Sequence, residues 1–384
     1  MTLLSADKIH DGKKWLPENT VLEVDDTGRI NDIYLNGDFD HVIHYDGILC
    51  PGFVNAHCHV ELSHMKNLVP EHTGLTGFLL QVMRKRNDFT EKQKQLARES
   101  ALQEMIANGI VAVGDIANTT DTLSLREKGN LHWHTFVESI GFVPERAPLS
   151  FEFALKTWAA FAVQSGNEKV LKQSIVPHAP YSVSNKLFEL IAAHQRGATL
   201  SVHNQETEDE NHYYQNKTGA FSSFLKEINI DDTLFLPTGN TSLQSYSDWL
   251  SADSPLMLVH NTFSNEPDIK FVQSKFPQLF WCLCPNANLY IENRLPDIAL
   301  LDKNDCVICI GTDSLASNHQ LSVMTELLTI NEHFPEIGWE KLLRWATYNG
   351  ACALQMQEQT GLFSADKTPG IIHIKNDFSC ERIY

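Results

Sequence analysis

Short apolar runs alternate with longer stretches of mixed polarity through the middle of the chain. Eight such runs have the length and composition expected of β-strands. They cover residues 53–57, 110–115, 132–138, 172–178, 199–203, 256–260, 279–284 and 306–311. Between or after them lie stretches with a helical pattern, at residues 91–108, 150–164, 184–195 and 321–334. Eight strands separated by helices predict an α/β fold of the (β/α)₈ TIM barrel type, spanning residues 51–355.

Both ends of the chain have a different pattern of short strands joined by polar turns. Strands are predicted at 21–24, 30–35 and 45–50, and again at 371–374 after the Pro369-Gly370 turn. We expect residues 1–50 and 356–384 to pair as one small β domain beside the barrel.

Charge and cysteine content narrow the possible partners and compartment. A net charge of −18 argues against nucleic acid and anionic membranes as binding partners. No apolar run approaches the roughly 20 residues of a membrane span, and the first residues lack the pattern of a signal peptide. The eight cysteines show no compact disulfide spacing. These features predict a cytoplasmic protein with reduced thiols.

The predicted barrel places functional residues at the carboxyl ends of its strands. Polar residues that fall at or just after a strand end are His57, Asp115, Glu138, His178, His203, His260 and Asp313.

Four of the side chains near strand ends have the composition of a metal site. His57 and His59 alternate with Cys58, so both rings point to one side of an extended backbone. His203 and Asp313 follow two later strands. Three nitrogens and one oxygen suit one divalent ion. We expect Zn²⁺ rather than Fe²⁺, although Fe²⁺ accepts the same ligands.

Two other motifs favour a structural interpretation. His132 and His134 form a second His-x-His pair, but it begins its strand and so lies at the wrong end of the barrel. Cys306 and Cys309 have the C-x-x-C spacing inside an apolar run, whereas redox and zinc pairs occupy helix starts and turns.

Three further residues are candidates for catalysis or binding. Glu206, three residues after His203, could act as a proton shuttle, or it could be a solvated loop acid. His260 could orient an attacking water, or it could be a hydrogen-bonded core histidine. His178 could contact substrate, although the flanking prolines alone would explain a rigid turn there.

Taken together, five segments resemble the amidohydrolase superfamily, in its mononuclear deaminase branch. They are PGFVNAHCH at 51–59, PHAPY at 177–181, HNQET at 203–207, CPNANL at 284–289 and GTDS at 311–314. The resemblance implies a (β/α)₈ barrel with a β-sandwich built from both termini.

The resemblance also implies a role for each candidate. One metal ion would be held by His57, His59, His203 and Asp313. Catalysis would use Glu206 as the proton carrier, His260 to hold the hydroxide and Asp313 to accept a proton from water, while His178 would contact the substrate ring. Binuclear relatives carry a modified lysine at the end of strand four, where this chain has His178.

A narrower resemblance, to the aminofutalosine deaminases, rests on the HVELS segment at 59–63, on Gly77-Phe78 and on the basic segment 84–86. It makes Glu61, His64, Phe78 and Arg86 candidates for contacts that set specificity.

The predicted function is a metal-dependent hydrolytic deaminase that releases ammonia from an amino-substituted purine, nucleoside or related heterocycle. A chlorohydrolase or a cyclic amidohydrolase would use the same site, and a non-catalytic binding protein is the third alternative. The expected partner is a small-molecule substrate, with a homodimer as the predicted assembly.

Overall fold

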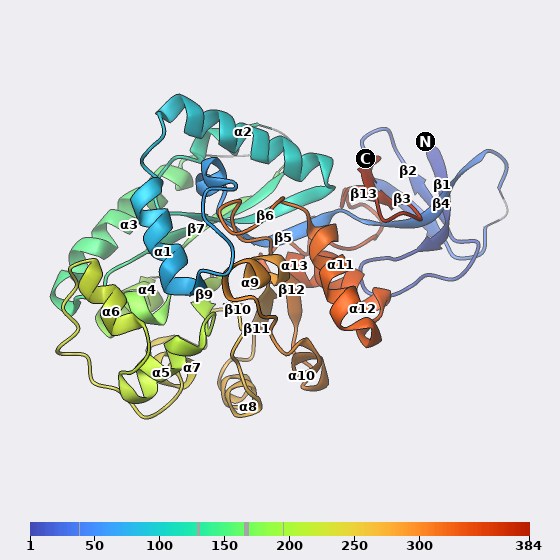
Figure 1. Cartoon of the computed structure of the whole chain (residues 1–384). Coiled ribbons are helices and arrows are strands. Elements are labelled where there is room, and N and C mark those ends of the chain that lie inside the picture. Colours follow the sequence, from blue (N-terminus) through green and yellow to red (C-terminus); the bar gives the residue numbers. More distant parts are fainter. Residues whose placement is uncertain (38, 129–130, 165–168, 195) are drawn as a thin grey trace.

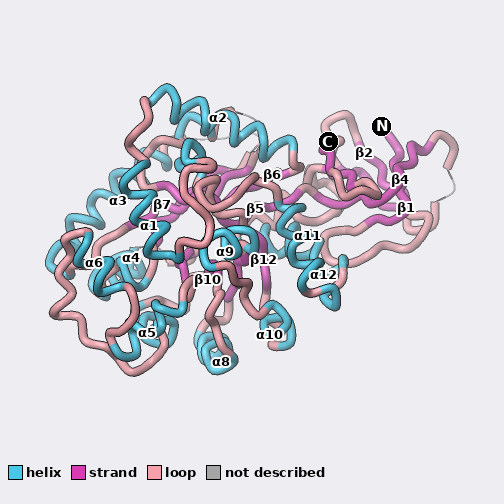
Figure 2. Tube along the Cα trace, in the orientation of Figure 1, coloured by secondary structure: helices cyan, strands magenta, loops and turns pink. Residues whose placement is uncertain are grey.

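The fold divides into a larger α/β part and a smaller β part (Figure 1). It is known from a computed structural model that describes residues 1–37, 39–128, 131–164, 169–194 and 196–384. Figure 2 shows the strands of the larger part gathered inside a surrounding set of helices.

All eight strands predicted for the middle of the chain are present. They form two parallel four-stranded sheets, ordered β5-β6-β7-β8 and β9-β10-β11-β12. Their bounds are β5 (Phe53–Cys58), β6 (Ile110–Ala117), β7 (His132–Ser139), β8 (Leu171–Pro177), β9 (Leu200–Asn204), β10 (Leu256–His260), β11 (Leu279–Leu283) and β12 (Ile308–Ile310). The last strand is shorter than the apolar run from which it was predicted.

Backbone hydrogen bonds join the two sheets at both of their edges. Beyond the end of β8, His203 N donates to His178 O at 2.9 Å. Beyond β12, Thr312 N and Asp313 N donate to His57 O at 3.0 and 3.1 Å. The carboxyl ends of the strands therefore open on one side of the molecule, which is where the candidate residues were expected.

Helices cover the outside of the strands (Figure 1). Four of them, α2, α3, α4 and α11, correspond to the predicted helices with bounds that agree within three residues; the last residue of the predicted helix 184–195 lies outside the described residues. The helices are α1 (Gly74–Lys85), α2 (Glu91–Ala107), α3 (Ala147–Ala162), α4 (Asn185–His194), α5 (Glu208–Asn216), α6 (Phe221–Glu227), α7 (Ser242–Tyr246), α8 (Glu266–Lys275), α9 (Pro285–Glu292), α10 (Ile298–Lys303), α11 (Val323–His333), α12 (Trp339–Arg344) and α13 (Gly350–Ala353).

Both ends of the chain build one six-stranded sheet, in the order β14-β13-β4-β1-β2-β3. The head and tail pair as expected, because β13 runs antiparallel to β4. Since β1 pairs with both β4 and β2, the ladder is continuous, and the six strands form one sheet rather than the two separate sheets of a sandwich. The bounds are β1 (Thr2–Ile9), β2 (Val21–Val24), β3 (Ile30–Tyr34), β4 (Val42–Pro51), β13 (Ile371–Ile374) and β14 (Cys380–Arg382).

The small sheet has its own apolar core, and the chain leaves it through a single glycine. Leu4, Leu22 and Ile371 are among the buried side chains of this core. Gly52 separates β4 from β5, and a Cβ atom there would lie 2.2 Å from Val111 Cγ1. Only glycine allows the backbone to pass so close to β6.

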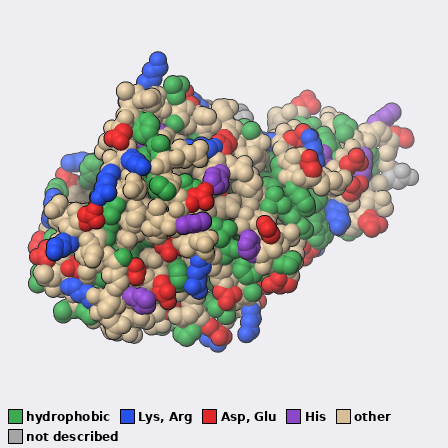
Figure 3. All heavy atoms as spheres, in the orientation of Figure 1, with side chains coloured by type: hydrophobic (Ala, Val, Ile, Leu, Met, Phe, Trp, Pro, Cys, Tyr) green, Lys and Arg blue, Asp and Glu red, His purple; other side chains and the backbone are tan. Residues whose placement is uncertain are grey.

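The surface carries charges of both signs, and the cysteines form no disulfide among the described residues. Basic and acidic side chains are interspersed over the face in Figure 3. All eight cysteines are unpaired. Among the described residues, no helix combines the length and the apolar character needed to cross a bilayer.

Candidate metal centre

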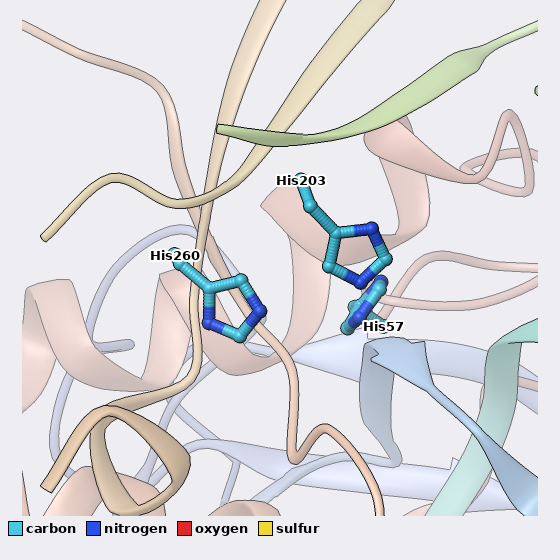
Figure 4. Close-up of side chains that lie close together, drawn as sticks. All are labelled: His57, His203 and His260. Atoms are coloured by element: carbon cyan, nitrogen blue, oxygen red, sulfur yellow. The ribbon is translucent and has the colours of Figure 1, made fainter. Parts of the chain in front are cut away.

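The strand ends bring together the four side chains predicted as metal ligands. His57 and His59 come from the end of β5, His203 from β9 and Asp313 from the loop after β12. His59 Nε2 lies 3.2 Å from His203 Nε2 and 3.4 Å from Asp313 Oδ1. His57 Nε2 lies 3.7 Å from the same carboxylate oxygen. Figure 4 shows His57, His203 and His260 converging from three different strands.

These separations match the spacing of atoms around a single small cation. Zinc–nitrogen bonds of about 2.0–2.1 Å in a tetrahedron place neighbouring ligand atoms about 3.3 Å apart. The three measured distances lie around that value. Without a cation, four electron-rich groups this close would repel one another, so the arrangement fits a bound divalent ion.

The protonation of the histidines leaves lone pairs at the centre. His203 Nδ1 lies 3.0 Å from the carbonyl oxygen of His178 and donates its proton to that oxygen. The Nε2 atom of the neutral His203 ring is therefore unprotonated. Both ring nitrogens of His57 are buried without a hydrogen-bond partner. Burial lowers the pKa of His57, His59 and His203 to about 4, which keeps all three rings neutral and able to bind metal.

Local backbone geometry positions Asp313. Its φ is 56°, in the left-handed region that Asp tolerates better than most residues. Gly311, two residues earlier, lets this loop approach β5. A Cβ atom at position 311 would lie 2.8 Å from His57 Cβ and 2.9 Å from His57 O. Ser317 Oγ donates a short hydrogen bond to Asp313 Oδ2 and leaves Oδ1 facing the histidines.

The pKa values of two acids beside the centre are shifted in opposite directions. Burial works to raise the pKa of Asp313, but the adjacent imidazoles of His57, His59 and His260 hold that pKa well below its usual range. Burial, reinforced by the charge of Asp313, raises the pKa of Glu206 well above its usual range. The surroundings therefore favour the ionised form of Asp313 and the protonated form of Glu206.

His260 lies between the centre and Glu206. Its Nε2 is 3.6 Å from Glu206 Oε1. Asn288 Nδ2 donates to its Nδ1 at 3.3 Å, so the ring carries its own proton on Nε2. The φ of His260 is 73°, another left-handed backbone at a strand end. Strained backbone of this kind is often retained where it directs a functional side chain.

A cavity of about 400 Å³ opens above these groups. Its polar floor includes His59, His203, Glu206, His260 and Asp313. Its walls are largely apolar and come from α1 and from the region of α6 onwards, with the side chains Leu75, Phe78, Leu79, Val82, Met83, Phe224, Leu225, Ile228 and Ile230. The volume lies within the range of small-molecule sites.

The predicted substrate contacts divide into lining and supporting residues. Phe78, Arg86 and His178 line the cavity. Glu61 is buried and is not among the lining residues; its carboxylate lies 3.3 Å from Arg86 Nη2. His64 also supports this region, since its Nε2 lies 3.0 Å from Arg86 O.

Sequence reasoning gave no role to several residues that shape the site. Glu138 is the penultimate residue of β7 and lines the cavity beside Asn118. The position of Glu138 near a strand end was a signal for it. Asn118, Asn288 and Ser317 carried no such signal: Asn118 and Asn288 contact residues 20 and 28 positions away in the sequence, and Ser317 contacts Asp313 within one loop.

The motifs interpreted as structural lie away from the centre. His134, near the start of β7, contacts Leu354 O at 3.2 Å and Ser174 Oγ at 3.0 Å. Cys306 and Cys309 are both unpaired, and Cys309 is buried in β12. Lys172 lies near the start of β8 and donates to Gln355 O, far from the metal ligands.

A cluster of histidine and aspartate side chains at the carboxyl ends of eight parallel strands is the arrangement found in metal-dependent hydrolases of α/β fold. The chain belongs to the Amidohydrolase family, whose model matches residues 48–380.

Individual relatives include deaminases. The chain is 27% identical to an adenosine deaminase of Helicobacter pylori over 319 residues, which cover 81% of this chain and 75% of that protein. Its fold is similar to the crystal structure of Helicobacter pylori aminofutalosine deaminase in complex with methylthio-coformycin, with a TM-score of 0.79, 22% identity, and coverage of 97% and 91%. An adenosine deaminase from Xanthomonas campestris with bound zinc gives a TM-score of 0.72 at 17% identity, covering 97% of this chain and 84% of that one.

Proposed function

We propose that this chain is a hydrolytic deaminase that releases ammonia from a 6-aminopurine nucleoside or a closely related amino heterocycle. The observation that carries the proposal is the convergence of His57, His59, His203 and the Asp313 carboxylate, with the buried Glu206 carboxyl group 3.6 Å from His260 Nε2 beside them. The names of the relatives support the same reaction class.

The proposed cofactor is one divalent ion, Zn²⁺ before Fe²⁺, held by His57, His59, His203 and Asp313. The unpartnered nitrogens of His57 and the ligand spacing support this assignment. When bound, the ion acts as a Lewis acid that lowers the pKa of water towards neutrality.

The side chains supply the proton transfers. The carboxylate of Asp313 accepts a proton from the attacking water. The Nε2–H of His260 donates a hydrogen bond that holds the water oxygen. Glu206 gives its proton to the ring nitrogen next to the reacting carbon; its carboxylate then takes the proton of the added hydroxyl group and passes it to the departing amine, and the proton held by Asp313 returns to Glu206 to restore the site. His178, Phe78 and the apolar wall hold the ring.

The same residues favour deamination over loss of chloride. An amine leaves only after it is protonated, and a buried acid such as Glu206 is suited to that task. Chloride needs no proton to leave. An assay that measures both ammonia and chloride from matched amino- and chloropurines distinguishes the two reactions, and we expect ammonia.

Arg86 and Glu61 are proposed to act as a pair. Arg86 reaches the cavity and contacts the part of the substrate furthest from the metal, while Glu61 positions the guanidinium from behind.

We also propose that the two four-stranded sheets form one closed (β/α)₈ barrel over residues 51–355, with residues 1–50 and 356–384 as a separate β unit. The hydrogen bonds at both sheet edges and the separate core of the small sheet support this division. The cytoplasmic location and the homodimer stay predictions.

A further inference from the structure

The carboxyl group of Glu206 lies buried at the cavity and receives no hydrogen bond from another side chain of the described residues. His260 Nε2 is 3.6 Å from its Oε1, which is too far for a hydrogen bond of normal length. A group that transfers protons to substrate needs a defined direction. The backbone at Glu206 therefore has to set the direction of this side chain.

The backbone turns sharply just before Glu206. Gln205 directly follows β9 and has a φ of 46°, in the left-handed region that few residues other than glycine adopt. Such a conformation persists only where the surrounding structure fixes it. Gln205 N donates to Glu210 Oε1 at 2.9 Å, and Gln205 O accepts from Phe263 N at 3.0 Å. Two segments, α5 and the loop after β10, thus hold the main chain of this turn.

The side chain of Gln205 holds the same turn from inside the protein. It is fully buried, and its Nε2 donates to Asn211 Oδ1 at 3.0 Å and to Asp268 Oδ2 at 2.8 Å. Its Oε1 accepts from Ser264 Oγ at 2.6 Å and from Asn204 Nδ2 at 3.3 Å. Because both hydrogens and both lone pairs of the amide are used, the side chain cannot rotate without losing hydrogen bonds.

Asp268 connects this amide to α8. It is fully buried in the first turn of that helix, and its Oδ1 accepts from Thr241 Oγ1 at 2.6 Å and from Gln244 Nε2 at 2.8 Å. Neither Gln205 nor Asp268 is among the residues that line the cavity. Both can therefore affect a bound substrate only through the residues of the turn that they hold.

We propose that Gln205 and Asp268 are positioning residues, which hold the turn after β9 and so direct the Glu206 carboxyl group at the substrate. This inference rests on the proposed deaminase function. His203 precedes the turn and is held separately, since its Nδ1 donates to His178 O at 3.0 Å. Loss of the Gln205–Asp268 contact should therefore impair proton transfer by Glu206 and leave the metal ligands in place.

The test begins with Asp268→Asn in the zinc-loaded enzyme. An asparagine has only one side-chain oxygen, so its NH₂ group would face the NH₂ group of either Gln205 or Gln244. With the 6-aminopurine nucleoside that wild type deaminates fastest, we expect kcat to fall by about 100-fold, as a displacement of about 1 Å can cause. KM and zinc content should not change. Exposed Asp253→Asn is the matched control and should keep the wild-type kcat.

Gln205→Asn is a second variant that leaves Asp268 itself intact. Asparagine tolerates the left-handed turn, but its side chain is one methylene shorter and withdraws the amide from Asp268. We expect the same pattern, with a lower kcat and unchanged KM and zinc content. If Asp268→Asn does not fold, Gln205→Asn decides the outcome.

Both substitutions are then repeated in the Glu206→Gln background, which separates positioning from a general structural effect. Without the Glu206 carboxyl group there is nothing left to direct, so each should change the residual rate by less than about two-fold. A wild-type kcat in either single variant, the same fold loss in both backgrounds, or a loss of zinc would overturn the positioning role and leave the deaminase function standing. A wild-type chain that deaminates no 6-aminopurine nucleoside would overturn both.

Discussion

The surroundings of two buried carboxyl groups beside the candidate metal centre push their pKa values apart. The neighbouring imidazoles lower the pKa of Asp313, whereas burial raises the pKa of Glu206. Pairs of acids with opposite protonation states are a recurrent basis for assigning a base and an acid.

Replacement of Glu206 by Gln should abolish the proton transfers without disturbing the metal ligands. We expect kcat to fall by about 10³-fold, within the range for general acid–base catalysis, with zinc content unchanged. Ammonia release and elemental analysis measure the two quantities. Glu208→Gln makes the same substitution at an exposed position and serves as the control. Full turnover in Glu206→Gln would exclude this residue from the mechanism.

Ser317→Ala should weaken metal binding without removing a ligand. The variant loses the hydroxyl that donates to Asp313 Oδ2, so the carboxylate is less well oriented. Loss of such a supporting group typically costs about 10- to 100-fold in metal affinity. Competition with a chromophoric chelator measures this change, and exposed Ser274→Ala provides the comparison. Equal affinities in the two variants would contradict the proposed support.

The convergence of His57, His59, His203 and Asp313 could be predicted from the sequence because each falls at a strand end and two of them share a local spacing. The supporting residues could not. Asn118 and Ser317 both lie in loops: the contact of Asn118 with Glu138 forms only once the strands are assembled, and the contact of Ser317 with Asp313 depends on the conformation of a single loop.

Gly311, directly after β12, should not tolerate a side chain. In Gly311→Ala the added methyl group would meet His57 Cβ and O, so the loop carrying Asp313 has to shift away from β5. We expect the free energy of unfolding to fall by about 1–3 kcal/mol and zinc to be retained less tightly. Denaturant unfolding of the metal-free protein and a chelator competition assay separate the two effects. An unchanged unfolding free energy would show that the contact relaxes freely.

The eight central strands were predictable because strands covered on both faces are continuous apolar runs. Strands that mix polar and apolar residues were harder to predict from the sequence. β1 carries the polar residues Ser5, Asp7 and Lys8, and β14 is only three residues long, so neither gave a clear signal. The single continuous sheet of the small β part follows from β1, since this strand bridges β4 and β2.

The stability of the whole molecule should fall in mild acid even without metal. Burial lowers the pKa of His134 to about 4, far from the centre. The folded state thus binds this proton less readily than the unfolded chain, whose histidine pKa is near 6.5. The stability contributed by neutral His134 is complete above pH 6.5 and is lost as the pH falls towards 4.

Between pH 7.5 and 5 this one group should cost about 2 kcal/mol. Urea unfolding of the metal-free protein at the two pH values measures the loss, and His134→Gln should reduce the difference by a similar amount. The same pH dependence in wild type and His134→Gln would contradict this assignment.

The cavity is a property of the assembled chain. Its apolar wall joins Phe78 and Val82 of α1 to Phe224 of α6 and Ile230 beyond it, segments about 150 residues apart. No periodicity within one segment reveals that pairing, which explains why Phe78 was singled out through a family resemblance and Phe224 was not.

Deaminase activity measured against zinc content tests most directly whether one metal ion at this centre drives the reaction. Metal-free protein is loaded with increasing zinc, and ammonia release is measured with the best substrate of a panel of 6-aminopurine nucleosides. We expect activity to rise linearly and to level off at one zinc per chain. No ammonia from any member of the panel, or a break at two zinc ions per chain, would contradict the mononuclear deaminase.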